Sequence, residues 1–195
     1  GTHRPNILLI VCDQLRLDAL SAYGGTDART PNLDRLVQGG LSFTNHICTN
    51  PVCGPNRSTI FTGRMTCETG VIRNGLPIRD GMPTMGEWFR AQGYETLYCG
   101  KWHLPEPYTH RIPGFDVLPV GDGEGDLVDP FVSRSVSAWL RNRPVRANQP
   151  FLAVAGFLQP HDICHWKLNA RHYMNDRVPF KGLREAMPSL PPNLH

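Results

Sequence analysis

Two apolar runs constrain the fold more than any other feature of this 195-residue chain. Residues 6–13 read NILLIVCD, and residues 151–157 read FLAVAGF. Nearly unbroken apolar runs of this length, without polar alternation, are typical of strands buried on both faces of a parallel sheet. Because parallel strands need long crossovers, commonly helices, between them, these runs predict an α/β architecture.

Helix and strand signals alternate between the two runs. Pro31 opens a short helix that ends at residue 39, with Leu33, Leu36 and Val37 as its apolar face. The TMGE sequence at residues 84–87 is typical of a capping box, which begins a helix. The other expected elements are strands at residues 41–45 and 94–99 and a helix that opens at Pro130. Together they predict a mostly parallel central sheet flanked by helices.

Polar residues directly follow three of the expected strands. Asp13 and Gln14 follow the first, the KWH sequence of 101–103 follows the strand at 94–99, and His161 lies just beyond the last run. In open parallel sheets, ligand-binding groups collect beyond the carboxyl ends of the strands. A solvated strand end explains any one of these segments, whereas the three together predict a site.

The most specific segment is residues 52–64, VCGPNRSTIFTGR. Pro55 suits the first turn of a helix, which would place Cys53 at the amino end, where free N–H groups favour an anion. We therefore expect a stabilised thiolate at Cys53 and interpret it as a nucleophile or a modified nucleophile. Arg57, one turn further, can reach the same anion.

This segment resembles the signature of the type I sulfatases of the alkaline phosphatase superfamily, in which the Cys is oxidised to formylglycine. The usual pattern has Ser or Ala where this chain has Asn56. Three further motifs occur in the order that the family requires: the first strand with Asp13-Gln14, GKWH at 100–103, and PH at 160–161. The similarity covers most of residues 5–165.

The resemblance implies a mechanism in which residue 53, as a hydrated aldehyde, attacks sulfur through one hydroxyl and later ejects sulfate through the other. Oxygen ligands favour Ca²⁺ or Mg²⁺. The implied metal ligands are Asp13, Gln14 and Cys53. The resemblance also implies that Arg57 and Lys101 are clamps that hold the sulfate and the diol. His103 is implied as the base that acts on the diol. His161, or alternatively His165, is implied as the acid that protonates the leaving group.

Three functions stay open at this point. The first is an arylsulfatase-like hydrolase of small-molecule or carbohydrate sulfate esters, matured by the formylglycine-generating enzyme. The second is a phosphonate or phosphodiester hydrolase, to which Asp13-Gln14 lends support, and the third is a truncated anion-binding fragment without turnover. Since the family is about twice as long, we interpret residues 1–195 as the amino-terminal part of a catalytic domain, truncated on the C-terminal side. We expect the isolated chain to be inactive.

Charge and composition limit which binding partners and which cellular location we expect. The formal net charge is +3 without a basic run, so no nucleic-acid partner is expected. No apolar stretch approaches the roughly 20 residues of a membrane span. The chain begins without a signal peptide, and we expect an exported protein, periplasmic or extracellular.

Cysteines and one acidic segment allow further expectations. Cys12 and Cys99 lie in apolar runs and are expected in the core. Cys48 and Cys67 flank the signature and could pair in an oxidising compartment. The acidic residues of 122–129 lack EF-hand spacing, so a solvated loop is expected there rather than a calcium loop.

Overall fold

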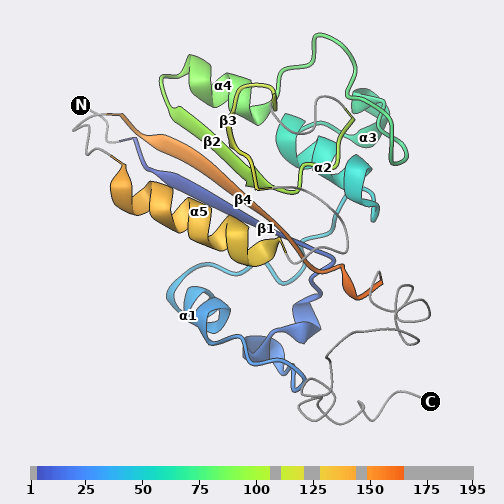
Figure 1. Ribbon diagram of the computed structural model, residues 1–195. Coiled ribbons are helices and arrows are strands. Elements are labelled where there is room, and N and C mark those ends of the chain that lie inside the picture. The colour runs from blue at the N-terminus through green and yellow to red at the C-terminus, as the bar shows by residue number, and fades with distance from the viewer. Residues whose placement is uncertain (1–3, 106–110, 121–127, 144–148, 165–195) are drawn as a thin grey trace, which may run out of the picture. The chain divides into compact units, whose positions relative to one another are not determined.

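A four-stranded parallel sheet forms the centre of the larger of two units into which the chain divides. The computed structural model describes residues 4–105, 111–120, 128–143 and 149–164. Unit 1 comprises Gly1–Asp13 and Ile47–Asp162. Its strands lie in the order β1 (Ile7–Asp13), β4 (Phe151–Pro160), β2 (Glu95–Gly100) and β3 (Asp116–Leu118), and each neighbouring pair is parallel (Figure 1). The α/β class and the parallel sheet are thus confirmed.

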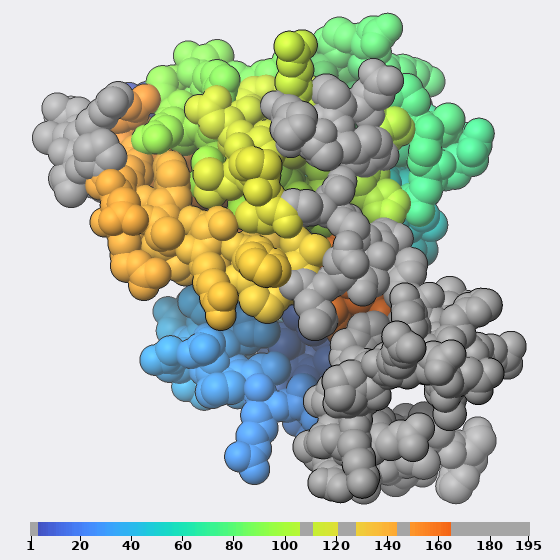
Figure 2. Space-filling model, in the orientation of Figure 1, coloured from blue at the N-terminus to red at the C-terminus, as the bar shows by residue number. Residues whose placement is uncertain are grey.

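Helices cover both faces of this sheet. Helix α5 (Asp129–Asn142) packs on one face, whereas α2 (Cys53–Thr62) and α4 (Met85–Ala91) lie on the other, with the short α3 (Thr66–Thr69) beside α2 (Figure 1). Atoms of α5 lie on the visible surface in Figure 2, and Phe131 of this helix is exposed. Among the helices of the described ranges, none has both the length and the apolar character to cross a membrane.

Two apolar clusters form because successive side chains of a strand point to opposite faces of the sheet. Tyr98 and Val154 belong to an aromatic-rich cluster on the α2 and α4 side. Cys99 and Ala155, the next residues along each strand, pack with Val132 of α5. A central strand buries side chains on both faces, and this explains the unbroken apolar run of β4.

Strand β1 is less buried than its sequence predicted. It lies at the edge of the sheet, beside β4 alone. Ile7 and Leu9 pack against the aromatic cluster, whereas Leu8 and Ile10, which point to the opposite face, are about half exposed. The expectation of burial on both faces is therefore wrong for β1, since an edge strand has a neighbour on one side only.

Strands β2 and β4 approach each other closely at the carboxyl end of β2. Gly100 has a φ of +99°, and a Cβ placed on it would lie 2.0 Å from the carbonyl oxygen of Gly156. The N–H of Lys101 donates to that same oxygen at 3.0 Å. This contact requires glycine at position 100 and fixes the point where the chain leaves β2.

Unit 2 comprises Gln14–His46 and Ile163–His195, and its described part contains α1 (Pro31–Gly39) and the 3-10 helices η1 (Leu17–Ala19) and η2 (Ser21–Tyr23). Asp34 of α1 accepts hydrogen bonds from the Ser21 hydroxyl at 2.6 Å and from the Ala22 N–H at 3.0 Å. The helix at 31–39 is confirmed. The apolar face of α1 is not buried, since the helix has no buried residue and Leu36 is exposed.

The expected strand at residues 41–45 is also wrong. This segment has no strand assignment, and Leu41 and Phe43 are both exposed. A strand is stabilised by a neighbouring strand and a buried face. The described part of unit 2 supplies neither one for these residues.

The cysteines are free thiols throughout the described residues. Cys48 and Cys67 are exposed and do not form the disulfide that their positions allowed. Cys99 is buried as expected, and Cys12 is partly buried. Burial raises the pKa of Cys99 to about 11.

Candidate active site

Asp13, the last residue of β1, carries the negative charge at the carboxyl edge of the sheet. Its side chain is largely buried, with Lys101 Nζ at 2.6 Å and Arg57 Nη2 at 3.7 Å from its Oδ2. Burial alone would raise the pKa of Asp13, but the hydrogen bond and charge of Lys101 and the charge of Arg57 outweigh it and lower that pKa. Asp13 is therefore a carboxylate at neutral pH.

The two cations of this site are buried and joined through one backbone oxygen. Arg57 is 3% exposed and Lys101 is 2% exposed. Arg57 Nη1 donates to the carbonyl of Lys101 at 2.7 Å, and the Tyr98 hydroxyl donates to the same carbonyl at 2.5 Å. Burial raises the pKa of Tyr98, so its phenol keeps the donated proton. With Asp13, the two cations leave a net positive charge that suits an anion.

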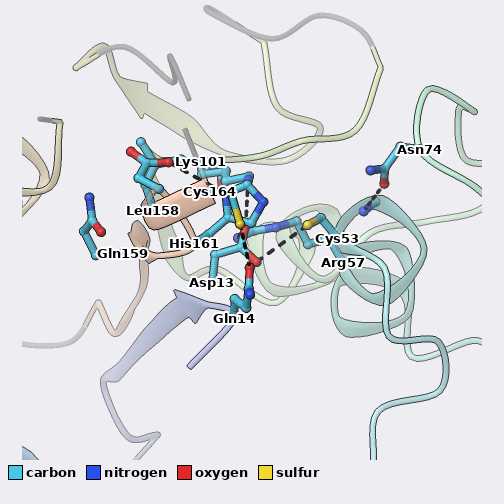
Figure 3. Close-up of polar contacts among 12 residues, drawn as sticks. Asp13, Gln14, Cys53, Arg57, Asn74, Lys101, Leu158, Gln159, His161 and Cys164 are labelled. Carbon is cyan, nitrogen blue, oxygen red and sulfur yellow. Dashed lines mark hydrogen bonds and ion pairs between the residues drawn. The ribbon is translucent and has the colours of Figure 1, made fainter. Parts of the chain in front are cut away.

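Cys53 is the first residue of α2, as the position of Pro55 predicted. Its thiol donates to Asp13 Oδ1 over a distance of 3.7 Å, and Figure 3 shows the two side chains turned toward each other. The helix start is held by Asn74, whose Oδ1 accepts from the Gly54 N–H at 2.8 Å. Sequence reasoning missed Asn74, because a lone Asn in a loop carries no signal of this contact.

The expected thiolate at Cys53 is wrong. Burial and the adjacent Asp13 carboxylate raise the pKa of Cys53, and the opposing effects of Lys101 and Arg57 are smaller. The helix start favours a thiolate, but the Asp13 carboxylate lies close to the sulfur and disfavours a second negative charge. Unmodified Cys53 is therefore a neutral thiol at neutral pH, and the interpretation of residue 53 as a modified nucleophile stays a prediction.

Both predicted histidines lie near the start of α2. A ring nitrogen of His161, an oxygen of Asp13 and the sulfur of Cys53 all lie within 4.8 Å of one another. His103 is partly buried and has a φ of +59°, and its carbonyl oxygen lies 3.4 Å from where a Cβ on Gly54 would be. The structure thus brings His103 and His161 to the region predicted for proton transfer.

Gln14 begins unit 2 and is described within that unit. It is exposed, has a φ of +60°, and its Oε1 lies 4.0 Å from the Cys164 thiol, which donates to it. Its role as a metal ligand stays a prediction. His165, the alternative to His161, lies outside the described residues.

Asp129 has a different role from the one that the sequence indicated. Residues 121–127 lie outside the described part, but Asp129 is the first residue of α5. Its two carboxylate oxygens accept hydrogen bonds from the N–H groups of Leu158, at 2.7 Å, and Gln159, at 2.9 Å. Asp129 therefore anchors the end of β4, two residues before His161, and does not belong to a solvated loop.

The donor atoms fit a divalent cation when residue 53 supplies oxygen. The cluster of Asp13, Cys53 and His161 has the dimensions of a coordination sphere, whose metal–oxygen bonds are about 2.0–2.6 Å for Mg²⁺ and Ca²⁺. A thiol is a poor ligand for these hard cations, but an aldehyde hydrate at the same position is a good one. Asp13 and a converted residue 53 are the candidate ligands in this unit.

The fold and the site define an α/β protein in which a carboxylate, two buried cations and a thiol meet at the carboxyl edge of a parallel sheet. The family model for sulfatases matches residues 5–115, more than half of the chain. The chain belongs to the sulfatase family, within the alkaline phosphatase superfamily.

Individual relatives agree with this assignment. An ulvan-active sulfatase from Formosa agariphila is 33% identical over 182 residues, which cover 81% of this chain and 36% of that protein. A 2-O GAG sulfatase superposes with a TM-score of 0.66 at 28% identity, over 84% of this chain and 36% of the other. A protein solved with its substrate D-glucosamine-2-N,6-O-disulfate gives a TM-score of 0.68 at 27% identity, over 81% and 35%. The chain thus spans about a third of the length of these relatives.

Proposed function

We propose that the protein of which this chain forms part or all hydrolyses organic sulfate esters through a formylglycine derived from Cys53. The observation that supports this most is the contact of Cys53, at the start of α2, with Asp13, which is itself paired with the buried Lys101 and Arg57. A thiol that is neutral and partly buried beside a carboxylate is a weak nucleophile, so conversion to an aldehyde hydrate would give the position its reactivity.

The cations bind and orient the substrate in this proposal. Arg57 and Lys101 hold the sulfate oxygens and the hydroxyls of residue 53, and their burial excludes water that would weaken these charges. Asp13 and residue 53 would hold Ca²⁺ or Mg²⁺, and the metal-ligand role of Gln14 stays a prediction. The bound cation supplies positive charge that stabilises the sulfate as the ester bond breaks.

The histidines move protons. His103 accepts the proton of the diol hydroxyl that ejects sulfate, and His161 donates a proton to the leaving alcohol oxygen. The partly buried position of each beside the start of α2 supports these roles. A sulfated carbohydrate is the substrate class that we propose, because two of the relatives above act on ulvan and on a disulfated glucosamine.

Mass spectrometry combined with turnover tests this function. The chain, in its complete gene product, is co-expressed with a formylglycine-generating enzyme, and the peptide containing residue 53 should lose about 18 Da. The converted protein should hydrolyse 4-nitrophenyl sulfate in Ca²⁺ and should prefer it over 4-nitrophenyl phenylphosphonate. Cys53→Ala should abolish turnover, whereas Cys67→Ser, at an exposed thiol close to the signature, should retain it. A converted protein that prefers the phosphonate would contradict the proposal.

A further inference from the structure

The turn after β4 contains a buried carboxylate that the roles above do not use. Asp162 directly follows His161, and its side chain is 0% exposed. Within the described ranges, neither of its carboxylate oxygens accepts a hydrogen bond. A buried carboxylate without hydrogen bonds is costly unless a positive charge lies close to it. We therefore expect Asp162 to have a partner that carries a positive charge during at least part of the reaction cycle.

The ion-pair partner of Asp162 in this part of the chain is His161. Asp162 Oδ1 lies 3.7 Å from His161 Nδ1. That nitrogen is inaccessible to solvent, although the His161 side chain as a whole is 17% exposed. Nδ1 therefore faces the protein interior on the Asp162 side, and Nε2 is the ring nitrogen on the opposite side of the imidazole.

We propose that Asp162 is a positioning residue for His161. The carboxylate favours the tautomer that keeps a proton on Nδ1, and it stabilises the imidazolium that forms when Nε2 also binds a proton. As a hydroxyl oxygen of the residue 53 hydrate bonds to sulfur and the sulfur–oxygen ester bond breaks, the Nε2 proton passes to the ester oxygen. The alcohol then leaves, the sulfuryl group stays on residue 53, and the imidazole becomes neutral. Asp162 itself contacts no reacting atom. This inference rests on the proposed function, in which His161 protonates the leaving group.

Leaving groups of different basicity separate this role from a structural one. The converted, complete protein and its Asp162→Asn variant are compared on 4-nitrophenyl, phenyl and 4-methoxyphenyl sulfate, which differ little in shape. A nitrophenolate leaves without protonation, so kcat on that substrate should change less than about threefold. On the two poorer leaving groups kcat should fall about 100-fold, the usual contribution of a general acid. A carboxylate that only supported the fold would affect all three substrates alike.

Three further variants control the experiment. Asp116→Asn removes an exposed carboxylate paired with Arg90 and should leave every rate unchanged. Asp162→Glu keeps the charge and should restore part of the loss. It also provides a test if Asp162→Asn fails to fold. In a His161→Ala background, Asp162→Asn should cause no additional loss on phenyl sulfate, because the two residues act as one unit.

The outcomes are distinguishable from those of the proposed function. An equal loss of kcat on all three substrates in Asp162→Asn would overturn the role of Asp162. An additional loss of kcat from Asp162→Asn in the His161→Ala background would overturn it as well. In both cases the sulfatase activity of the unsubstituted protein would be unaffected. If the converted wild-type protein hydrolysed none of the sulfates, the proposed function would fail and this inference with it.

Discussion

At the scale of single residues, Asp13 has two roles, and a substitution there would affect both. It neutralises part of the charge of two buried cations and, in the proposed function, binds the metal. Asp13→Asn should lower the free energy of unfolding by about 3–5 kcal/mol at neutral pH, because it leaves buried cations without their partner. It should also abolish the rise in Tm that Ca²⁺ produces in the unsubstituted protein.

The pH dependence of this loss follows from the lowered pKa of Asp13. A carboxyl group with a lowered pKa in the folded state stabilises the protein above its unfolded pKa of about 3.9, and this contribution disappears as pH falls through the folded value. The difference between the variant and the unsubstituted protein should therefore shrink in acid. Urea unfolding at several pH values measures it. A pH-independent difference, or an Asp13→Asn protein that Ca²⁺ still stabilises, would contradict this account.

At the scale of elements, the contact between β2 and β4 determines where Lys101 emerges. A methyl group at position 100 would meet the Gly156 carbonyl oxygen at 2.0 Å and Val132 at 3.0 Å. Gly100→Ala should therefore cost more than about 3 kcal/mol, through both the strain of a positive φ and the displacement of a strand. Gly75→Ala is the matched control, because Gly75 has a φ of +83° and open space around it.

The control should lose only about 1 kcal/mol, the cost of a left-handed conformation for alanine. Chemical denaturation of the two variants gives the comparison, and activity provides a second measurement. Gly100→Ala should also reduce turnover, since Lys101 directly follows the altered position. Equal stability losses for the two variants would show that the Gly156 carbonyl oxygen does not prevent a side chain at position 100.

The elements that the sequence predicted correctly are those whose signals are local. The unbroken run of β4, the capping box of α4 and the proline that opens α5 each depend on nearby residues, and all three elements form as expected. The edge position of β1 and the exposure of residues 41–45 depend on which segments lie beside them, and a single sequence does not contain that information. Strand β3, with three residues, is too short for a periodic signal.

The candidate site also has some features that the sequence predicted and others that it did not. Motif order predicted that Asp13, Cys53 and His161 would meet, and they do. The charge state of Cys53 was not predictable from its place on a helix, because it depends on a carboxylate 40 positions away in the sequence. Asn74 and Asp129 bind backbone N–H groups, and contacts of this kind leave no pattern in the sequence.

At the scale of the whole molecule, we expect residues 1–195 alone to bind Ca²⁺ weakly and to hydrolyse sulfate esters slowly, even with residue 53 converted. Ca²⁺ takes 6–8 oxygen ligands, whereas the candidates in this chain are Asp13, Gln14 and the hydrate at residue 53. Water would complete the coordination and weaken the charge available to the substrate. The half-exposed Leu8 and Ile10 on edge strand β1 should also favour self-association.

The measurement is made on purified residues 1–195 after the aldehyde has been verified. Isothermal titration with Ca²⁺ gives the affinity, 4-nitrophenyl sulfate gives the turnover, and analytical ultracentrifugation gives the association state. Monomeric protein with submicromolar Ca²⁺ affinity and rapid turnover would show that these residues already form a complete site.

The carbonyl oxygen of Lys101 receives hydrogen bonds from both Arg57 and Tyr98, so the backbone of one cation is held by the side chain of the other. A rotamer change that moved the Arg57 guanidinium away from this carbonyl would therefore break a buried hydrogen bond. Any drift of the α2 start away from the end of β2 would break a buried hydrogen bond as well as separate the charges. Over evolutionary time, this mechanical linkage means that the spacing between the two cations can change only through coordinated substitutions in both segments.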